Sequence, residues 1–470
     1  MPSSLAPRLG RPRAATFATA ALAGLLALGL GACLGNTGTI SVSVVTAPES
    51  PLRASVERVR LTLTNPRTLV EATRRDGAFS LALEASASGD PASVFVEAFD
   101  ADGELVAVGR SPDFVVGPID ARLAIYLAPP ESFAEAPVHL AAARAELGAA
   151  GLRYGTLLVG GRDRGGAPRG EIEIYNAYDH TLARGLDLPA PRAGAAVAAT
   201  SDGRAFIVGG FGPDGAAQAT AWRFDTNLAP AGAFAELPSA AAPRAGERAL
   251  QTSDSSFVLT GPPARIDVAA GSVVAGAGAE LPSAAAAVAK AQLVTVVAAG
   301  AAVRRYRDGV VDELEIPQAR RVGHALVATQ DDHIAVIGGE LDSALTADVV
   351  KIDPDSGAAT VIPGVLETPR RRAAVARTRG LIVVAGGVGG SGLVLDTAEL
   401  LDATTLAHVA TVPMTARADA SLEHLPNDQL LLVGGFDDRG LPTARLELFT
   451  PRLPVLADLL GAAAPASEAP

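Results

Sequence analysis

An arginine recurs six times along this chain, each time 16 or 17 residues ahead of a position that is usually glycine. The six are Arg144, Arg192, Arg244, Arg321, Arg370 and Arg417. Arginine presents rigid, forked N–H donors that suit carboxylates and other anions. Repetition of one residue type at one offset therefore predicts either a cup of guanidinium groups that binds an anionic ligand or a structural contact made once in every repeat. The sequence leaves both readings open.

The elements that must position these arginines are seven short apolar runs ending in a glycine pair. The first glycine of each pair falls at positions 160, 209, 260, 299, 338, 386 and 434, with Thr260 and Ala299 replacing it in the third and fourth copies. The fourth copy has Ser283 where the other copies have arginine. A strand followed by Gly-Gly at a spacing near 50 residues is typical of a repeated β-architecture.

This repeat resembles that of kelch proteins. The resemblance covers residues 138–460 and implies a seven-bladed β-propeller with four strands in each blade. The family's strand-four tryptophan is absent, since the only tryptophan is Trp222. In the last repeat four strands can be found in order, ending with 453–457, so we expect no strand from the N-terminal side to complete it.

The segments after the glycine pairs differ in length. Copies one, two, five, six and seven have about ten residues there, whereas copies three and four pass almost directly into the next strand. Antiparallel pairing of the first two strands puts these loops beside the arginines. In a closed ring the five long loops are neighbours, so the sequence predicts one arc of binding loops.

The N-terminus has the order of a secretory signal. Arg8, Arg11 and Arg13 precede an uncharged stretch over 14–32, and the chain's only cysteine follows at Cys33. The sequence Leu-Gly-Ala-Cys resembles the lipobox of bacterial lipoproteins, which implies a signal peptide over 1–32 and lipidation of Cys33. The alternative is an uncleaved helix of 19 residues that just spans a bilayer. Leu34 replaces the aspartate of inner-membrane retention, which favours an outer-membrane lipoprotein in the cell envelope, facing the periplasm or the surface.

Residues 33–128 alternate apolar and polar positions in short runs separated by turn sequences such as Asp76-Gly77 and Asp102-Gly103. This pattern predicts a small immunoglobulin-like β-sandwich. Residues 129–137 are predicted to be a proline-bearing linker, and the small, polar tail at 461–470 is predicted to be disordered. The whole chain is therefore expected to be all-β, with a sandwich followed by a propeller.

Composition excludes several function classes. The net charge of −12 argues against nucleic-acid binding, and the six histidines show no metal-ligand spacing. With no cysteine beyond Cys33, the copper–tyrosine cofactor of galactose-oxidase-type propellers cannot be built. We therefore expect no metal or cofactor, no catalysis, and a lipid-anchored protein that binds a protein or glycan. The alternative is a propeller enzyme acting on a carbohydrate, such as a mutarotase or lyase.

Overall fold

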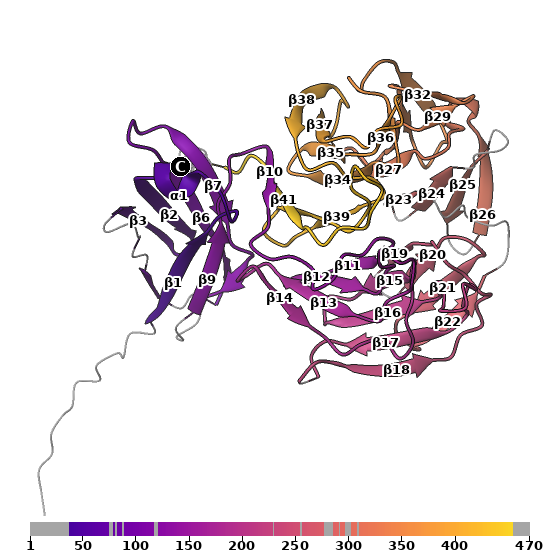
Figure 1. The fold of residues 1–470 in the computed structure, drawn as a ribbon, viewed down its shortest axis with the longest axis horizontal. Coiled ribbons are helices and arrows are strands. Elements are labelled where there is room, and N and C mark those ends of the chain that lie inside the picture. Colours follow the sequence, from indigo (N-terminus) through magenta and orange to yellow (C-terminus); the bar gives the residue numbers. More distant parts are fainter. Residues whose placement is uncertain are drawn as a thin grey trace, which may run out of the picture. The chain divides into compact units, whose positions relative to one another are not determined.

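The computed structural model describes residues 37–454, except 75–78, 80–81, 87–88, 117–120, 229, 254–255, 277–284, 291, 297–301 and 308–309. The predicted signal peptide, Cys33 and the predicted disordered tail lie outside these residues. The described chain is all-β, as the sequence predicted, with many four-stranded antiparallel sheets (Figure 1). None of its described helices is long and apolar enough to cross a membrane.

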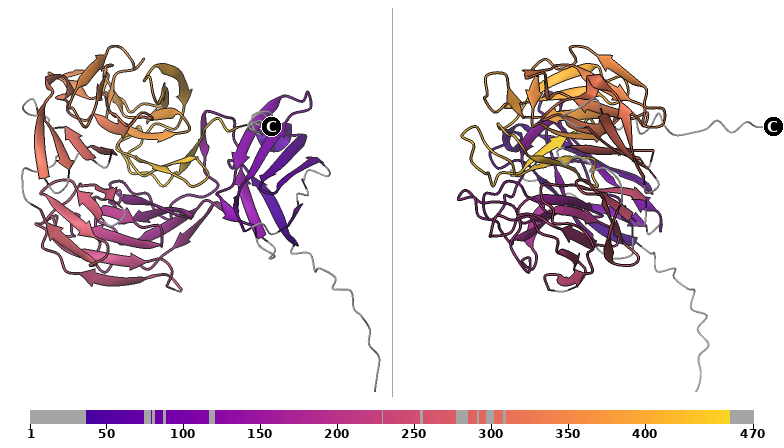
Figure 2. Two further views of the ribbon diagram at one scale, coloured as in Figure 1. Left: turned by 180° about the vertical axis from the view of Figure 1, so that it is seen from behind. Right: turned by 90° about the vertical axis from the view of Figure 1, so that its right-hand side faces the viewer.

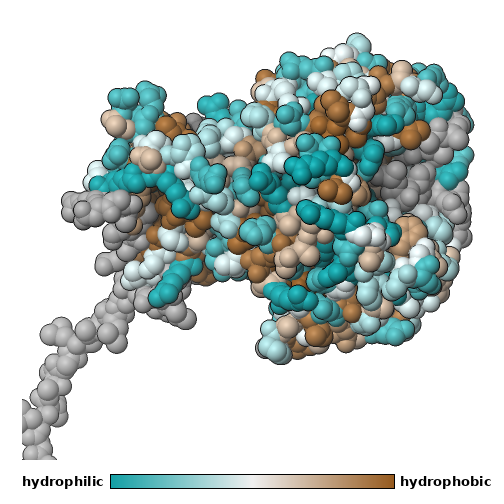
Figure 3. Space-filling model, viewed as in Figure 1, coloured by the Kyte–Doolittle hydropathy of each residue, from teal (hydrophilic) through white to brown (hydrophobic). Residues whose placement is uncertain are grey.

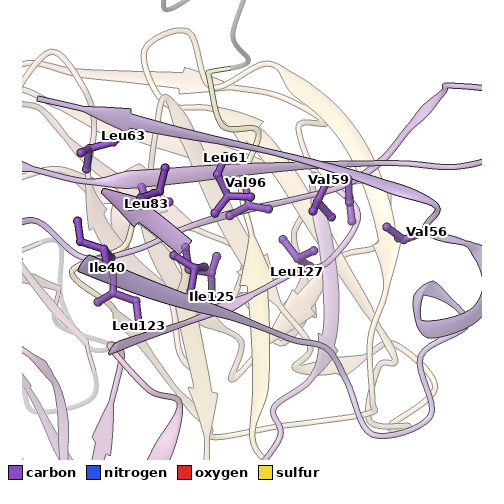
Figure 4. Close-up of a cluster of buried hydrophobic side chains, with 14 of the residues drawn as sticks. Ile40, Val56, Val59, Leu61, Leu63, Leu83, Val96, Leu123, Ile125 and Leu127 are labelled. Atoms are coloured by element: carbon purple, nitrogen blue, oxygen red, sulfur yellow. The ribbon is translucent and has the colours of Figure 1, made fainter. Parts of the chain in front are cut away.

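The first part of the chain forms two sheets over one core. A three-stranded sheet has the order β4 (Ala82–Ser86), β1 (Thr37–Val45), β9 (Ala121–Tyr126). A four-stranded sheet has the order β3 (Arg67–Thr73), β2 (Arg58–Thr64), β6 (Val94–Phe99), β7 (Leu105–Arg110). Alternate residues of both sheets are buried together, including Ile40, Leu61, Leu83, Val96 and Ile125 (Figure 4). Burial of one face explains the period-two pattern.

Seven further four-stranded antiparallel sheets occupy the described residues between 132 and 450. We number them by chain order of their first strands. Sheet one is β11 (Gly148–Leu152), β12 (Gly155–Val159), β13 (Ile172–Asn176) and β14 (Thr181–Arg184); sheet two is β15 (Ala196–Ala199), β16 (Arg204–Val208), β17 (Ala221–Asp225) and β18 (Ala233–Leu237). Sheet three is β19 (Ala249–Ser253), β20 (Ser256–Leu259), β21 (Ala264–Asp267) and β22 (Ser272–Ala275); sheet four is β23 (Ala286–Ala289), β24 (Gln292–Val296), β25 (Ala302–Arg307) and β26 (Val310–Glu315).

The remaining three sheets carry extra hairpins or a distant strand. Sheet five is β27 (Ala325–Ala328), β28 (Ile334–Ile337), β31 (Val349–Ile352) and β32 (Ala359–Ile362); sheet six is β34 (Ala374–Thr378), β35 (Leu381–Ala385), β37 (Thr397–Asp402) and β38 (His408–Pro413). Sheet seven is β39 (Ser421–His424), β40 (Leu430–Val433), β41 (Glu447–Thr450) and β10 (Ser132–Glu135). Each apolar run before a glycine pair is therefore the second strand of a sheet.

Strand β10 corrects the prediction that the last repeat supplies all four of its own strands. It lies within the predicted linker and pairs antiparallel with β41, so that Phe133 stands opposite Phe449 with ring centroids 5.2 Å apart. The expected fourth strand at 453–457 is not formed in its described part, Leu453 and Pro454. Pro451 and Pro454 lack the N–H groups that a ladder needs, whereas β10 offers a phenylalanine to a buried aromatic partner.

Neighbouring sheets meet through their first strands. β11 contacts β15, β15 contacts β19, β19 contacts β23, and the series continues through β27 and β34 to β39, which contacts β11 (Figures 1 and 2). The glycine pairs lie where each second strand ends. Gly209 and Gly210 have φ of 69° and 89°, and a Cβ on Gly209 would lie 2.5 Å from the Arg244 carbonyl oxygen. Only glycine fits this crowded, left-handed position.

Candidate functional site

A cavity of about 850 Å³ is lined by the first strands of the seven sheets and by the residues just before them. Its walls are mainly small side chains, such as Ala149, Ala198 and Ala286. Most of the charged lining residues lie where the first strands begin and the glycine pairs end, and we call this end of the cavity the mouth. In the view of Figure 3, hydrophilic residues are mixed with smaller hydrophobic groups over the molecular surface.

The six predicted arginines do not face this cavity as a cup of free guanidinium groups. All six are buried, with exposed fractions between 0% for Arg144 and 4% for Arg192. Burial lowers the pKa of Arg144, and Glu173 opposes that shift. A guanidinium buried in this way must find its hydrogen-bond partners inside the protein.

Sheet six shows the contact in full. Arg370 Nη1 donates to the carbonyl oxygens of Gly386 and Thr397, at 3.0 and 2.8 Å. Its Nη2 donates to Glu399 Oε1 at 2.5 Å, and that carboxylate is itself fully buried. Sheets one and seven repeat the arrangement, with Arg144 against Glu173 and Arg417 against Glu447. The arginine thus ties the first glycine carbonyl to the start of the third strand.

Where the third strand has no glutamate, the arginine finds another partner. Arg192 of sheet two lies over the ring of Trp222, 4.8 Å from its centroid, and donates to Thr220 Oγ1 at 3.0 Å. Arg321 of sheet five donates to the carbonyl oxygens of Gly338 and Asp348, at 3.1 and 2.6 Å. The chain's only tryptophan therefore replaces a carboxylate as the counterpart of an arginine.

These contacts favour the structural reading of the arginines and argue against the anion-binding cup, which requires accessible donors. The partners of Arg144 and Arg370 lie within the arginine's own sheet. Ser283, the counterpart in the fourth repeat, lies outside the described residues. The sequence thus located the repeated arginine, but it did not predict whether the side chain faces the cavity or is buried within its sheet.

A second repeated position, which sequence reasoning missed, lies two residues after each arginine. All six residues there have positive φ, between 51° and 72°: Glu146, Gly194, Gly246, Gly323, Arg372 and Asp419. Three repeats use glycine, which adopts this conformation readily, and three use a charged residue, which does so at a cost. The signal available in the sequence was the glycine at this fixed offset in three repeats.

Backbone hydrogen bonds link these positions from sheet to sheet. The N–H of Gly194 donates to the carbonyl oxygen of Glu146, and that of Gly246 donates to Gly194, both at 2.7 Å. On the other side, the N–H of Arg372 donates to Gly323 at 2.7 Å and that of Asp419 to Arg372 at 3.1 Å. The left-handed conformation is therefore required by the contact between adjacent sheets, whatever the side chain.

The three charged side chains at these positions are accessible and paired at the mouth. The side chain of Glu146 is 39% exposed and lies 3.0 Å from Arg162 Nε, while Arg372 Nε lies 2.8 Å from Asp419 Oδ2. Hydrogen bonding to Asp419 raises the pKa of Arg372. Arg162 also lies 5.7 Å from the ring centroid of Phe211, in the next sheet. Glu247 and Arg248 line the same end of the cavity, so the described part of the mouth combines three carboxylates, three guanidinium groups and an aromatic ring.

Five hairpin loops lie beside the mouth of the cavity, as the sequence predicted. In sheets one, two, five, six and seven the loop after the glycine pair forms a bridge with the residue that follows the buried arginine, for example Ala145 with Arg162 and Ala418 with Phe436. Sheet three passes from Gly261 to β21 within three residues. The corresponding segment of sheet four lies outside the described residues. Contacts of β27, β34, β39, β11 and β15 make the five loop-bearing sheets neighbours.

Turn chemistry holds the loops in shape. Asp437 Oδ1 accepts hydrogen bonds from the N–H groups of Arg439 and Leu441, both at 2.9 Å, and Asp163 makes the same pair of contacts in sheet one. An aspartate that caps its own turn limits the number of conformations the loop can adopt. The loops of sheets one and seven are therefore hairpins closed by their own turn residues.

One histidine lines the cavity. His324 Nδ1 contacts the carbonyl oxygen of Arg321 at 3.0 Å, and burial lowers its pKa to about 4. Among the residues that the structure describes, no group of three or more His, Cys, Asp or Glu side chains could hold a metal ion. A scan against protein-family models gives no match for this chain, and neither does a search of curated proteins.

Proposed function

We propose that this chain is an outer-membrane lipoprotein anchored through Cys33. Its first sheets would be an immunoglobulin-like sandwich and its seven later sheets the blades of a kelch-type propeller that binds a partner. The closed series of first-strand contacts, from β11 round to β39 and back, supports a ring. The left-handed glycine pairs support the kelch resemblance.

The observation that carries the binding function is the mouth of the cavity. Its volume is in the range of small-molecule sites, and five hairpin loops stand on adjacent sheets beside it. Exposed charged side chains occupy backbone positions where glycine is the least strained residue. We propose that this face binds a glycan or a protein, without catalysis, and that the opposite turns serve the fold.

The test uses the soluble chain from residue 36 onward in a pull-down from cell-envelope extract and on a glycan array. Binding that is lost when residues 163–167 or 437–441 are replaced by a short turn, but kept when the β27–β28 turn is exchanged, supports the proposal. Binding as strong as that of wild type in both loop variants would overturn it. Turnover of a captured sugar would instead favour the carbohydrate-acting enzyme.

The anchor is tested separately. In a bacterial host, the full chain should incorporate labelled palmitate and sediment with outer membranes, and Cys33→Ala should abolish both. Retention of the label by Cys33→Ala would exclude the lipidation site. This result does not bear on the binding face, so the two parts of the proposal can fail independently.

A further inference from the structure

Of the six residues two positions after the buried arginines, three are glycine and three are charged. The backbone conformation explains the glycines but not the charged residues. Glu146, Arg372 and Asp419 have φ of 51°, 59° and 51°, which costs a non-glycine residue about 1 kcal/mol or more. Gly246 shows that glycine satisfies the same backbone geometry, and a Cβ there would meet nothing within 4 Å. The backbone contact therefore does not require a charged side chain at this position.

Ion pairing alone does not account for them. The side chains of Arg372 and Asp419 are 43% and 35% exposed, and those of Glu146 and Arg162 are 39% and 28% exposed. Ion pairs in such solvated positions contribute little to stability. Backbone strain at exposed positions is characteristic of binding and catalytic sites. These side chains are consequently better explained by a ligand than by the fold.

The set of groups restricts the ligand. Among the described residues that line the mouth, the carboxylates of Glu146, Glu247 and Asp419 and the guanidinium groups of Arg162, Arg248 and Arg372 carry no net charge together. Phe211 also lines the cavity, with Arg162 over its ring. A polyanion would meet Glu146 and Asp419, and a polycation would meet Arg162 and Arg372. Sugar hydroxyl groups both donate and accept hydrogen bonds, and the apolar face of a sugar ring can pack on an aromatic side chain.

We propose that the mouth binds the uncharged end of an oligosaccharide. Glu146 and Asp419 accept hydrogen bonds from its hydroxyl groups, Arg162 and Arg372 donate to its oxygens, and Phe211 packs against a sugar ring. The small residues behind them, Ala149 and Ala198 among others, leave the cavity open to the first sugar units. This inference rests on the proposed function of the same face and selects the glycan over the protein partner.

The test measures binding of maltotriose, cellotriose, mannotriose and chitotriose by titration calorimetry, with wild type and the variants Glu146→Gly and Asp419→Gly. We expect at least one trisaccharide to bind, and each variant to bind it about tenfold or more weakly. Because glycine suits the left-handed backbone, neither variant should have a lower melting temperature. This separates a binding role from a structural one.

Asp332→Gly is the matched control. Asp332 has φ of 56° in the turn between β27 and β28, at the opposite end of its sheet from the mouth, so this change relieves the same backbone conformation without altering the site. It should leave trisaccharide affinity unchanged. Binding of none of the four sugars, or affinities of both mouth variants within about twofold of wild type, would overturn the inference.

Failure of the binding face and failure of the sugar inference can be told apart by experiment. If no trisaccharide binds but exchange of residues 163–167 still abolishes capture of an envelope protein, the binding face stands and the sugar inference fails. If loop exchange has no effect on any capture, both fail. If a trisaccharide binds and Glu146→Gly weakens it, both are supported together.

Discussion

Arg370 and Arg372 are the same residue type two positions apart, yet their environments are opposite. Arg370 is 1% exposed and binds two carbonyl oxygens and a buried carboxylate inside sheet six. The side chain of Arg372 is 43% exposed at the mouth, on a residue with φ of 59°. The difference teaches that the role of a repeated residue is set by its backbone position and not by its chemistry.

The comparison holds in other sheets. Arg144 is buried and Glu146 exposed in sheet one, and Arg417 is buried and Asp419 more accessible in sheet seven. The first position joins strands within one sheet, so its residue type is restricted by what it must bond. The second position joins adjacent sheets through a backbone hydrogen bond that any residue can make, and only in sheets six and seven is a side-chain ion pair, Arg372 with Asp419, added to it.

The largest effect is expected when the buried member of the pair is removed. Arg370→Met leaves Glu399 buried without its cation, so the free energy of unfolding should fall by about 3–5 kcal/mol, as measured by urea denaturation. Adding Glu399→Gln should recover part of the loss, because a neutral amide costs less to bury. A fall below about 1 kcal/mol would mean that Arg370 behaves like a surface residue and would break the comparison.

A smaller loss is expected in sheet five. Arg321 bonds carbonyl oxygens only, because Val350 stands opposite Val336 in the register where Glu399 stands opposite Val384 in sheet six. Arg321→Met should cost about 2 kcal/mol from unsatisfied carbonyls, again by urea denaturation. A loss as large as that of Arg370→Met would show that the carboxylate is not what distinguishes the two sheets.

The pH dependence of the free energy of unfolding shows whether His324, which lines the cavity, is buried or solvated. Burial lowers its pKa from 6.5 to about 4, so the unfolded chain binds the proton more readily. The stabilisation from burying the neutral ring is complete above pH 6.5 and is lost as the pH falls towards 4, on the order of 3 kcal/mol. Buried His180 shifts in the same direction, so His324→Gln should remove only part of the loss. An unchanged pH profile would place His324 among the solvated residues of the mouth.

The smallest effect is expected at the exposed member of the pair. Arg372→Gly removes a solvated ion pair and relieves a left-handed residue, so stability should change by less than about 1 kcal/mol. The melting temperature of Arg372→Gly, measured together with that of Arg370→Met, provides the test. A destabilisation comparable to that of Arg370→Met would mean that both arginines belong to the fold.

Several features followed from local patterns. Each apolar run ending in glycines 160, 209, 338, 386 or 434 is a second strand. Continuous burial of the strand requires apolar residues, and the positive φ at its end requires glycine, so both are visible in the local sequence. The unequal loops also follow from local length. The sequence therefore predicted the all-β class, the repeat and the loop-bearing sheets of the described chain.

The partner of β41, the burial of the arginines and the ring of left-handed residues were decided by tertiary structure. β10 joins β41 across more than 300 residues, and no short pattern around Phe133 encodes that pairing. Arg370 and Arg372 cannot be distinguished in the sequence, because both positions carry the same side chain. Their difference arises only when adjacent sheets meet, since that contact fixes φ at one position and closes the protein over the other. Local sequence thus determined the strands and their repeat, whereas long-range packing determined which side chains reach the mouth.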